Sequence, residues 1–374
     1  MMSFWSYKNE YKKYNTTLKN IFDKTLRKGQ IFFGKNLSEF ESNFKKKYRA
    51  KFGIAVGSGT DAILISLLAL NLKKEDEVIT AANTAIPTIS AIINSGATPK
   101  LVDINDDYLM NIDSLKKAIT KKTKVIIPVH LYGKASNMID IMKISKKKKL
   151  HVIEDCAQSQ GSKFRNKFVG TFGISGCFSF YPTKILGSYG DGGFILTNNY
   201  KFYKSVKKIR FYGIDTFDKK NKFFNKYYSN INGVNSRLDE VSSKMLDFKL
   251  KKVDSFIYKR RKIAFIYNKE LKNTSLVLPK ISNDSDHVFH LYTVYHKKRE
   301  TIIKKLKNKG IPTSIIYEYP IHKMKAYKKY FNKKSFKNSE IKAKGIFSLP
   351  LYPDLKITTA KYISKELKKI LKHV

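Results

Sequence analysis

Hydrophobic positions in the first fifty residues recur every three or four positions, which is typical of amphipathic helices. This spacing predicts helices over 6–28 and 37–50. Further along, short apolar runs alternate with helical segments. The apolar runs predict strands near 77–80, 99–103, 124–130, 151–155, 175–180 and 192–197. The segments between them predict helices over 60–72, 85–95, 113–120 and 136–149.

The alternation of strands and helices predicts an α/β fold. Strands that are joined by helices form a mostly parallel sheet with helices on both faces. In such sheets, ligands bind at the carboxyl ends of the strands. Side chains that directly follow the strands are therefore the first candidates for a functional site.

From residue 236 the pattern changes to one long helix with an apolar stripe, which continues to residue 271. A smaller α+β segment follows, and the boundary between two domains is expected in the long helix near residue 250. The smaller segment is expected to contain strands at 290–296 and 312–316 and a helix at 300–309. The two expected domains are a large domain over 1–250 and a small C-terminal domain over 251–374.

The chain has 374 residues, of which 42% are hydrophobic, and this is enough to build a full core. No apolar stretch approaches the roughly 20 residues of a membrane span. The amino terminus also lacks the apolar core of a signal peptide. Cys156 and Cys177 make neither a disulfide framework nor a zinc-ligand spacing, and we expect no metal. These features predict a soluble cytoplasmic protein without a membrane partner.

Basic residues far outnumber acidic ones, with 74 Lys and Arg against 30 Asp and Glu and a formal charge of +44. Such a field attracts polyanions, including nucleic acid and phosphorylated substrates. The excess is spread over the whole chain, however, and Lys, Ile, Asn, Phe and Tyr are the residues that an AT-rich genome favours. Nucleic-acid binding is therefore not favoured. A polyanion-binding protein that keeps the fold without catalysis is the alternative.

A glycine-rich motif, VGSGTDA, leads into the helix predicted over 60–72. Free amides at the start of a helix can hold a phosphate, and glycine permits a tight turn before it. The motif also matches the dinucleotide fingerprint. However, it follows a basic, helix-like segment rather than a buried strand, and the acidic residues at 75–77 precede the next strand. We interpret the motif as a phosphate site for a group other than NAD, or as a helix cap without a ligand.

Asp155 and Lys184 also follow predicted strands. Asp155 ends the run HVIED, where a carboxylate can bind a metal, act as a base, pair with a protonated ring nitrogen or cap a helix. Lys184 follows the apolar segment FSFYPTK and precedes GDGG. Burial disfavours a charged amine, so the pKa of Lys184 is expected to fall, as a Schiff-base lysine requires. A surface lysine is the ordinary alternative. However, the phosphate motif, Asp155 and Lys184 occur in that order at the ends of successive strands, and this order favours a functional lysine.

Four other polar residues are less specific candidates. Ser179 offers a hydroxyl to a phosphate, and Asn235 either caps the next helix or reaches a phosphate. His130 and His322 are isolated in the sequence, and lone histidines are more often structural than catalytic. The sequence shows no pattern typical of a Ser-His-Asp or Cys-His catalytic arrangement.

Taken in order, these motifs resemble the DegT/DnrJ/EryC1/StrS family of pyridoxal-phosphate sugar aminotransferases, which have the fold type I architecture. The similarity covers nearly the whole chain and is specific as an ordered set. It is carried by GKNLSEFESNF (34–44), GSGTDA (57–62), ANT…GATP (82–99), HLYG (130–133), EDCAQ (154–158), FSFYPTK…GDGG (178–193), NSRLDE (235–240) and SLPLYPDL (348–355).

The resemblance implies a role for each matching residue. Lys184 would form the Schiff base with pyridoxal 5′-phosphate and then move the proton between the substrate carbon and the cofactor. Asp155 would pair with the pyridinium nitrogen, and Gln158 would pack near the ring and its 3-oxygen. The phosphate would be held by Gly59, Thr60, Asp61 and Ser179, and by Asn235 from the neighbouring subunit of a homodimer.

The resemblance also implies the reaction. Glutamate would donate its amino group through the pyridoxamine 5′-phosphate form of the cofactor to a nucleotide-linked keto sugar used in glycan synthesis. A dTDP-3-keto-6-deoxyhexose is the expected acceptor, and a 4-keto sugar is the alternative. Sugar dehydratases of the same family carry His where Lys184 stands, so the lysine favours transamination.

The chain departs from the family at three places. Ala85 stands where an aromatic residue often stacks on the cofactor ring, and Gln160 stands where His is common. The small-domain His-Tyr-Pro signature reads Ile316-Tyr317-Glu318. These differences concern substrate contacts, and they favour the subgroup that aminates 3-keto sugars. The residues nominated for substrate contacts are Tyr181, Tyr317 and His322.

Overall fold

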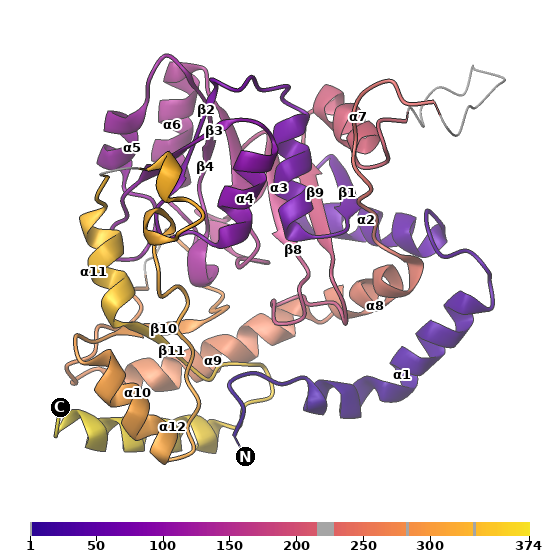
Figure 1. Ribbon diagram of the computed structural model, residues 1–374. Helices are drawn as coiled ribbons and strands as arrows, with labels where there is room; N and C mark the ends of the chain where they lie inside the picture. Colours follow the sequence, from indigo (N-terminus) through magenta and orange to yellow (C-terminus); the bar gives the residue numbers. More distant parts are fainter. Residues whose placement is uncertain (1, 215–227, 282–283, 332–333) are drawn as a thin grey trace.

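A computed structural model describes residues 2–214, 228–281, 284–331 and 334–374 (Figure 1). Its centre is a seven-stranded sheet in the order β1-β9-β8-β5-β4-β2-β3. The strands are β1 (Phe52–Val56), β2 (Glu77–Ala81), β3 (Thr98–Val102), β4 (Thr123–Ile127), β5 (His151–Asp155), β8 (Ser175–Ser179) and β9 (Gly193–Thr197). Only β9 runs antiparallel to its neighbours, β1 and β8, within this sheet. The predicted mostly parallel sheet is confirmed.

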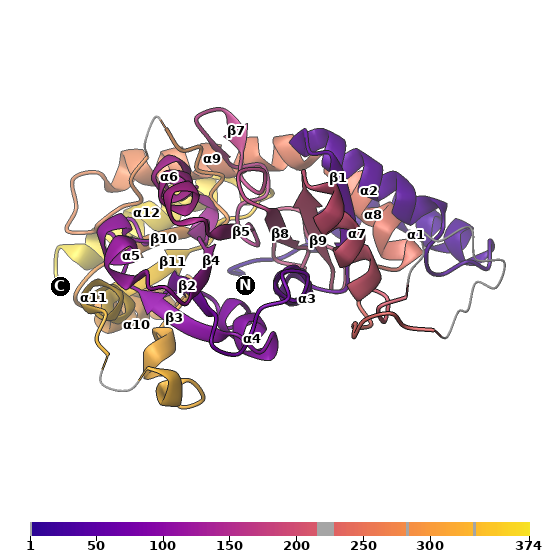
Figure 2. The same ribbon diagram turned by 90° about the horizontal axis from the view of Figure 1, so that it is seen from above.

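Helices cover both faces of the sheet (Figure 2). One face packs against α3 (Gly59–Leu68), α4 (Ile86–Asn94) and α7 (Tyr200–Ile209). The other packs against α2 (Lys35–Tyr48), α5 (Ile112–Ala118), α6 (Met138–Lys148) and α8 (Glu240–Leu250). Successive strand residues point to opposite faces, so Ile54 and Ala55 belong to different hydrophobic clusters. The sheet is thus a rigid platform whose strand ends can hold a site.

The C-terminal part has a hydrophobic cluster of its own, which includes Tyr267, Tyr292 and Phe347. Its elements are α9 (Val253–Leu271), β10 (Tyr292–Tyr295), α10 (Arg299–Asn308), α11 (Lys337–Gly345), β11 (Ile346–Leu349) and α12 (Ile357–Leu371). Helix α9 contributes to two clusters, because Val253 and Ile257 pack with the sheet whereas Ile263 packs with the C-terminal part. The domain boundary near residue 250 stays a prediction.

The remaining elements are short or peripheral. Helix α1 (Lys8–Leu26) packs against α8 at one end of the molecule (Figure 1). The others are β6 (Lys163–Phe164), β7 (Lys167–Phe168), η1 (Leu131–Gly133), η2 (Ile321–Lys323) and η3 (Lys328–Tyr330). In the part of the chain that the structure describes, no helix is long and apolar enough to span a membrane.

The glycine motif follows a strand, contrary to the interpretation of the sequence. The basic run ends at Lys51, and FGIAV then forms β1, which pairs with β9 from Phe52 to Val56. This strand is only five residues long, and its partners in β9 lie 137 to 145 positions away. The basic residues before it therefore hid it in the sequence pattern. The glycine motif therefore lies at a strand end, as a ligand-binding turn does.

Two predictions for the later part of the chain are also wrong. The long helix over 236–271 is two helices, because α8 starts only after its cap Asp239 and a turn at 251–252 separates it from α9. Residues 312–316 form no strand but only an isolated bridge between Ser314 and Ser348. Pro312 offers no amide to a ladder, which weakens strand pairing at that place.

Candidate active site

A cavity of about 330 Å³ lies at the carboxyl edge of the sheet, where β1, β5 and β8 end. Its wall also includes the start of α4 and one residue of the C-terminal part. The nominated residues that line it are Gly59, Thr60, Gln158, Asp155, Ser179, Tyr181, Lys184 and Tyr317. The cavity wall does not include Asp61, Asn235 or His322.

Lys184 lies in the turn that joins β8 to β9. Its amide donates to the carbonyl of Tyr181 (2.9 Å), and the loop closes where the Phe180 amide donates to the Gly192 carbonyl (2.7 Å). Burial lowers the pKa of the Lys184 amine to about 8, although the Asp155 charge opposes the shift. Near neutral pH a useful fraction of the amine is therefore uncharged and nucleophilic, as covalent chemistry with a carbonyl requires.

Asp155 ends β5, and its side chain is buried in the cavity wall. Its Oδ2 accepts a hydrogen bond from Thr88 Oγ1 (2.8 Å), and its Oδ1 accepts one from the Ala157 amide (3.1 Å). Thr84 Oγ1 donates to Thr88 Oγ1 (2.8 Å) from the turn before α4. These donors orient the carboxylate, which can then pair with a protonated ring nitrogen. Thr88 was not predicted from the sequence, although its place one turn after Thr84 on a helix start was a usable signal.

The start of α3 forms the opposite end of the site. The amides of Gly59 and Thr60 have no acceptor among the described residues, and both residues line the cavity. A Cβ on Gly59 would lie 2.6 Å from the Cβ of Ser179, so only glycine fits there. The Asp61 amide, by contrast, donates to the capping Ser58 Oγ (3.0 Å). Gly59, Thr60 and the Ser179 hydroxyl are thus placed to hold an anion, whereas the Asp61 amide is already used.

Gln158 and Tyr317 meet at the cavity wall from distant parts of the chain. Gln158 Oε1 accepts from the Tyr132 amide (2.8 Å), and its Nε2 donates to the Tyr317 hydroxyl (3.0 Å). Burial, followed by the nearby Asp155 charge, raises the pKa of Tyr317, so the phenol is neutral. The pair therefore presents neutral polar groups beside the buried carboxylate.

The other nominated residues lie elsewhere. His322 sits on η2, where its Nε2 contacts Glu340 Oε1 (2.8 Å). Burial alone would raise the pKa of Glu340. The hydrogen bonds that Glu340 receives from His322 and from the Phe336 amide outweigh burial and lower this pKa to about 2. His322 therefore braces η2 against α11. Asn235 is exposed on the surface and is bridged to Phe211.

Two of the positions at which the chain departs from the family pattern lie at or next to the cavity. Ala85 lines the cavity at the start of α4, where its side chain is a single methyl group. Gln160 is buried behind the wall, and its Nε2 donates to the carbonyl of Ser179 (2.6 Å). Gln160 therefore supports the turn that carries Ser179, whereas Ala85 lines the cavity itself.

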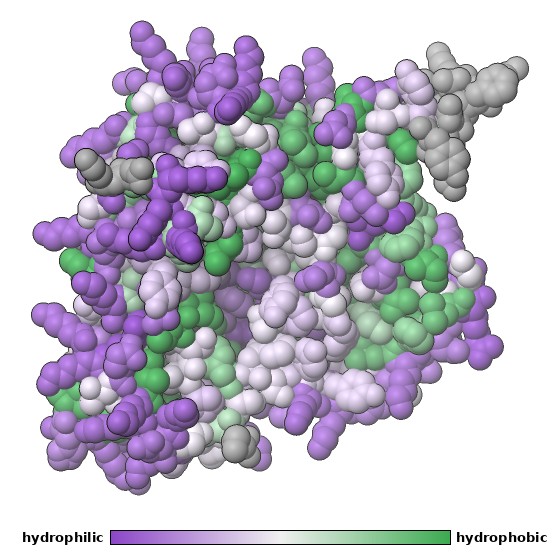
Figure 3. Space-filling view, in the orientation of Figure 1, coloured by the Kyte–Doolittle hydropathy of each residue, from purple (hydrophilic) through white to green (hydrophobic). Residues whose placement is uncertain are grey.

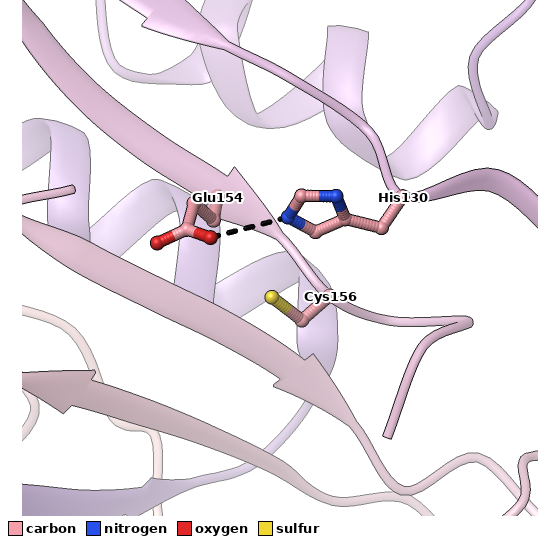
Figure 4. A group of neighbouring side chains, drawn as sticks. All are labelled: His130, Glu154 and Cys156. Carbon is pink, nitrogen blue, oxygen red and sulfur yellow. Dashed lines mark hydrogen bonds and ion pairs between the residues drawn. The ribbon is translucent and has the colours of Figure 1, made fainter. Parts of the chain in front are cut away.

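His130, Glu154 and Cys156 form a fully buried cluster next to the cavity (Figure 4). Their atoms could in principle hold a metal ion, but the ligand atoms of His130 and Glu154 are already used in hydrogen bonds. Glu154 accepts from His130 Nε2 (3.2 Å), and from the amides of Gly170, Phe172 and Gly173 (2.7, 2.7 and 2.9 Å). The Ser136 amide donates to His130 Nδ1 (3.0 Å), which leaves the ring proton on Nε2. The cluster ties the loop at 170–173 to β5 and is structural.

The cavity residues fit pyridoxal phosphate. Lys184 offers an amine to the aldehyde, Asp155 offers a carboxylate to the ring nitrogen, and Gly59, Thr60 and Ser179 offer donors to the phosphate. When bound, this cofactor supplies an electron-poor ring that stabilises negative charge on an attached substrate carbon. The fold and the site together define a pyridoxal-phosphate-dependent enzyme.

Comparison with known proteins narrows this class. The DegT/DnrJ/EryC1/StrS aminotransferase family model matches residues 13–368, and the chain belongs to this family. The dTDP-3-amino-3,4,6-trideoxy-alpha-D-glucose transaminase of Micromonospora megalomicea subsp. nigra is 35% identical over 358 residues, 94% of each chain. The dTDP-3-amino-3,6-dideoxy-alpha-D-galactopyranose transaminase of Aneurinibacillus thermoaerophilus is 39% identical over 355 residues, 94% of this chain and 95% of the relative.

A solved structure shows the same architecture over the whole chain. The X-ray structure of S. venezuelae DesV is 30% identical, covers 100% of this chain and 99% of its own, and superposes with a TM-score of 0.94. The protein is therefore a fold type I, pyridoxal-phosphate-dependent aminotransferase. The family, the fold class, the enzyme class and the cofactor that the sequence predicted are confirmed.

Proposed function

We propose that this aminotransferase moves an amino group from glutamate to a dTDP-linked 3-keto-6-deoxyhexose, in the synthesis of a glycan precursor. The observation that carries the proposal is that Lys184, Asp155 and the amides of Gly59 and Thr60 line one cavity. The two relatives described above are both named as transaminases of dTDP-linked 3-amino sugars, which supports amination at C3.

Each cavity residue has a part in this reaction. Lys184 takes the proton from the reacting substrate carbon and returns it, and a pKa of about 8 suits both directions near neutral pH. Asp155 keeps the ring nitrogen protonated, and Gln158 packs near the ring. Gly59, Thr60 and Ser179 hold the phosphate. A dehydratase of this family would have His in place of Lys184, so the lysine supports amino transfer.

The sugar nucleotide would approach from the open side of the cavity. Ile86 and Tyr181 line this side and are 48% and 52% exposed, and the small Ala85 lies next to Ile86 in the cavity wall. We assign Tyr181 and Tyr317 to substrate contacts. His322, which braces η2 through Glu340, acts only through the position of that segment.

We also propose that the active form is a homodimer with composite sites. Asn235 is exposed and does not line the cavity of its own chain. Exposed apolar side chains gather near it, since Phe33 packs on Phe211, the bridge partner of Asn235. The exposed apolar residues of this region are Ile31, Phe32, Phe33, Tyr212 and Ile231. An apolar surface of this kind is typical of a subunit interface, and it would bring Asn235 to the phosphate of the partner subunit.

The polyanion-binding alternative gains no support from the face of the molecule that Figure 3 shows. Figure 3 shows hydrophilic side chains along most of the outline of one face, around a paler and partly hollowed centre. A nucleic-acid groove would instead gather them in one stripe. The positive field still suits a substrate with a diphosphate, because it draws anions toward the surface.

An amino-transfer assay tests the proposed function. The purified enzyme, loaded with pyridoxal phosphate, is incubated with glutamate and with 3-keto or 4-keto sugars linked to dTDP or UDP. We expect 2-oxoglutarate to form fastest with the dTDP-linked 3-keto sugar. Faster turnover of a 4-keto sugar would move the reaction to C4, and no 2-oxoglutarate with any acceptor would refute the function.

A further inference from the structure

We propose that the Tyr317 hydroxyl donates a hydrogen bond to a negatively charged oxygen beside the reacting carbon. This role rests on the proposed function, because it presupposes the cofactor and an amino donor in the cavity. The acceptor is either the ring oxygen of the cofactor or the carboxylate of the amino donor. Both are anionic oxygens next to the reacting carbon, and both suit a phenolic donor.

The direction of this hydroxyl follows from the amide of Gln158. The two ends of a glutamine amide are distinguished by their partners rather than by their shape. One end of Gln158 faces the Tyr132 backbone amide at 2.8 Å, and a backbone N–H can only donate. That end is therefore the oxygen. The other end must be the NH₂ group, and it donates to the Tyr317 hydroxyl at 3.0 Å.

Tyr317 is left with a hydrogen to donate. Its oxygen accepts from Gln158, so its own O–H must point to a different partner. No acceptor for this hydrogen occurs within the described ranges of the chain, and Tyr317 lines the cavity. Burial and the Asp155 charge raise the pKa of Tyr317, so the hydrogen is retained throughout the neutral range. A buried O–H without an acceptor costs free energy, so an acceptor atom on a bound ligand would stabilise it.

The surrounding packing holds Tyr317 in place before a ligand arrives. The Tyr132 hydroxyl donates to the carbonyl of Ile316, the residue before Tyr317, at 2.5 Å. The Tyr132 ring also packs edge-on against Tyr108, with 5.4 Å between ring centroids. Tyr132 therefore fixes Gln158 through its amide and the backbone at 316 through its hydroxyl. A donor that is held in advance stabilises charge without reorganisation.

The Tyr317→Phe variant tests this role, because it keeps the ring and removes only the O–H. Tyr267→Phe is the matched control, since it removes a buried hydroxyl that donates to the Pro350 carbonyl (2.8 Å) in the C-terminal cluster. Two quantities are measured for wild type and both variants. One is the pH midpoint of the visible absorbance band of the cofactor-loaded enzyme without substrate, and the other is the KM for glutamate.

The two possible acceptors give different results. If Tyr317 donates to the ring oxygen, its loss makes that oxygen more basic, and the midpoint of the band rises in Tyr317→Phe alone. If it donates to the carboxylate, the midpoint is unchanged and the KM for glutamate rises about tenfold or more, as expected for a hydrogen bond to a charged group. Wild-type values of both quantities in Tyr317→Phe would overturn the role. The proposed function fails separately, if the wild-type enzyme itself transfers no amino group.

Discussion

Thr88 donates a hydrogen bond to Asp155 across 67 positions of sequence, with 2.8 Å between Oγ1 and Oδ2. Thr84 donates to Thr88 at the same distance. A hydroxyl has one hydrogen, so Thr88 accepts from Thr84 and directs its own hydrogen to the carboxylate. The start of α4 thus sets the direction of the charge that meets the cofactor ring.

Removal of this donor should weaken cofactor binding. Thr88→Val keeps the shape of the side chain, and we expect the Kd for pyridoxal phosphate to rise about tenfold, because a hydrogen bond to a charged group is worth about 1.5–3 kcal/mol. Thr88→Ser keeps the hydroxyl and should bind nearly as wild type. A fluorescence titration of the apoprotein measures both. Equal Kd values for Thr88→Val and wild type would show that Thr88 does not orient Asp155.

The reactivity of Lys184 should follow its lowered pKa. Only the uncharged amine attacks the cofactor aldehyde, so the rate of cofactor capture by the apoprotein should rise with pH, reach half of its maximum near pH 8 and level off about one pH unit above that. An ordinary lysine would keep gaining rate toward its usual pKa of about 10.4. Stopped-flow absorbance between pH 6 and 10 measures this profile, and a rate that still rises several-fold between pH 9 and 10 would contradict the lowered pKa of Lys184.

Substitution of Asp155 tests how its charge affects the pKa of Lys184. Asp155 raises the pKa of Lys184 against the larger effect of burial. In Asp155→Asn the opposing charge is gone, so the pH at which the capture rate levels off should move below that of wild type. An upward shift would mean that the Asp155 charge does not raise the pKa of Lys184.

Composite sites make a prediction about mixed dimers. Lys184→Ala removes the reactive amine of one chain, and Asn235→Ala removes the contact that we propose for the partner's phosphate. Each homodimer should be strongly impaired. Unfolding and refolding of an equal mixture should restore about one quarter of the wild-type activity, because half of the dimers are mixed and each has one intact site. A mixture no more active than its parents would show that Asn235 does not serve the site of the partner subunit.

Glu154 should matter for stability and not for metal binding. Glu154→Gln replaces an acceptor of four hydrogen bonds by a group that is half donor. We expect the free energy of unfolding in urea to fall by about 3 kcal/mol, since buried amides lose their acceptor. The control Glu75→Gln, at an exposed position, should cost no more than about 0.5 kcal/mol.

The same cluster predicts the result of metal removal. The ligand atoms of His130 and Glu154 are already used in hydrogen bonds. Dialysis of the holoenzyme against a chelator should therefore leave its activity unchanged. A loss that zinc restores would show that Figure 4 depicts a metal site.

The sequence predicted the sheet and the order of its functional residues because both are local. Strands such as β5 are apolar runs that end in a polar residue. Asp155 is the last residue of β5, and Lys184 lies five positions after the end of β8. Burial of a lysine beside an apolar strand also predicted the lowered pKa of Lys184. Of the seven strands of this sheet, only β1 was not predicted, since its five residues follow a basic run.

Long-range partners could not be predicted in the same way. Gln158 and Tyr317 are 159 positions apart, and their contact depends on how the C-terminal part docks on the sheet. Gln160 was interpreted as a departure from the family that concerns substrate contacts. Its side chain instead donates to the carbonyl of Ser179, and a pattern of residue types does not reveal such a contact. His322 was nominated for the substrate, yet its partner is Glu340, 18 positions further along. Such choices are decided by packing and not by local sequence.

Covalent capture of the cofactor at Lys184 is the most direct test of the site. The protein is loaded with pyridoxal phosphate, reduced with borohydride, digested and analysed by mass spectrometry. A buried amine with a pKa of about 8 that lines the cavity should carry one reduced cofactor per chain. The label should lie on Lys184 and be absent from Lys184→Ala. A label on a different lysine, or none on the wild-type protein, would contradict the assignment of Lys184 as the reactive residue.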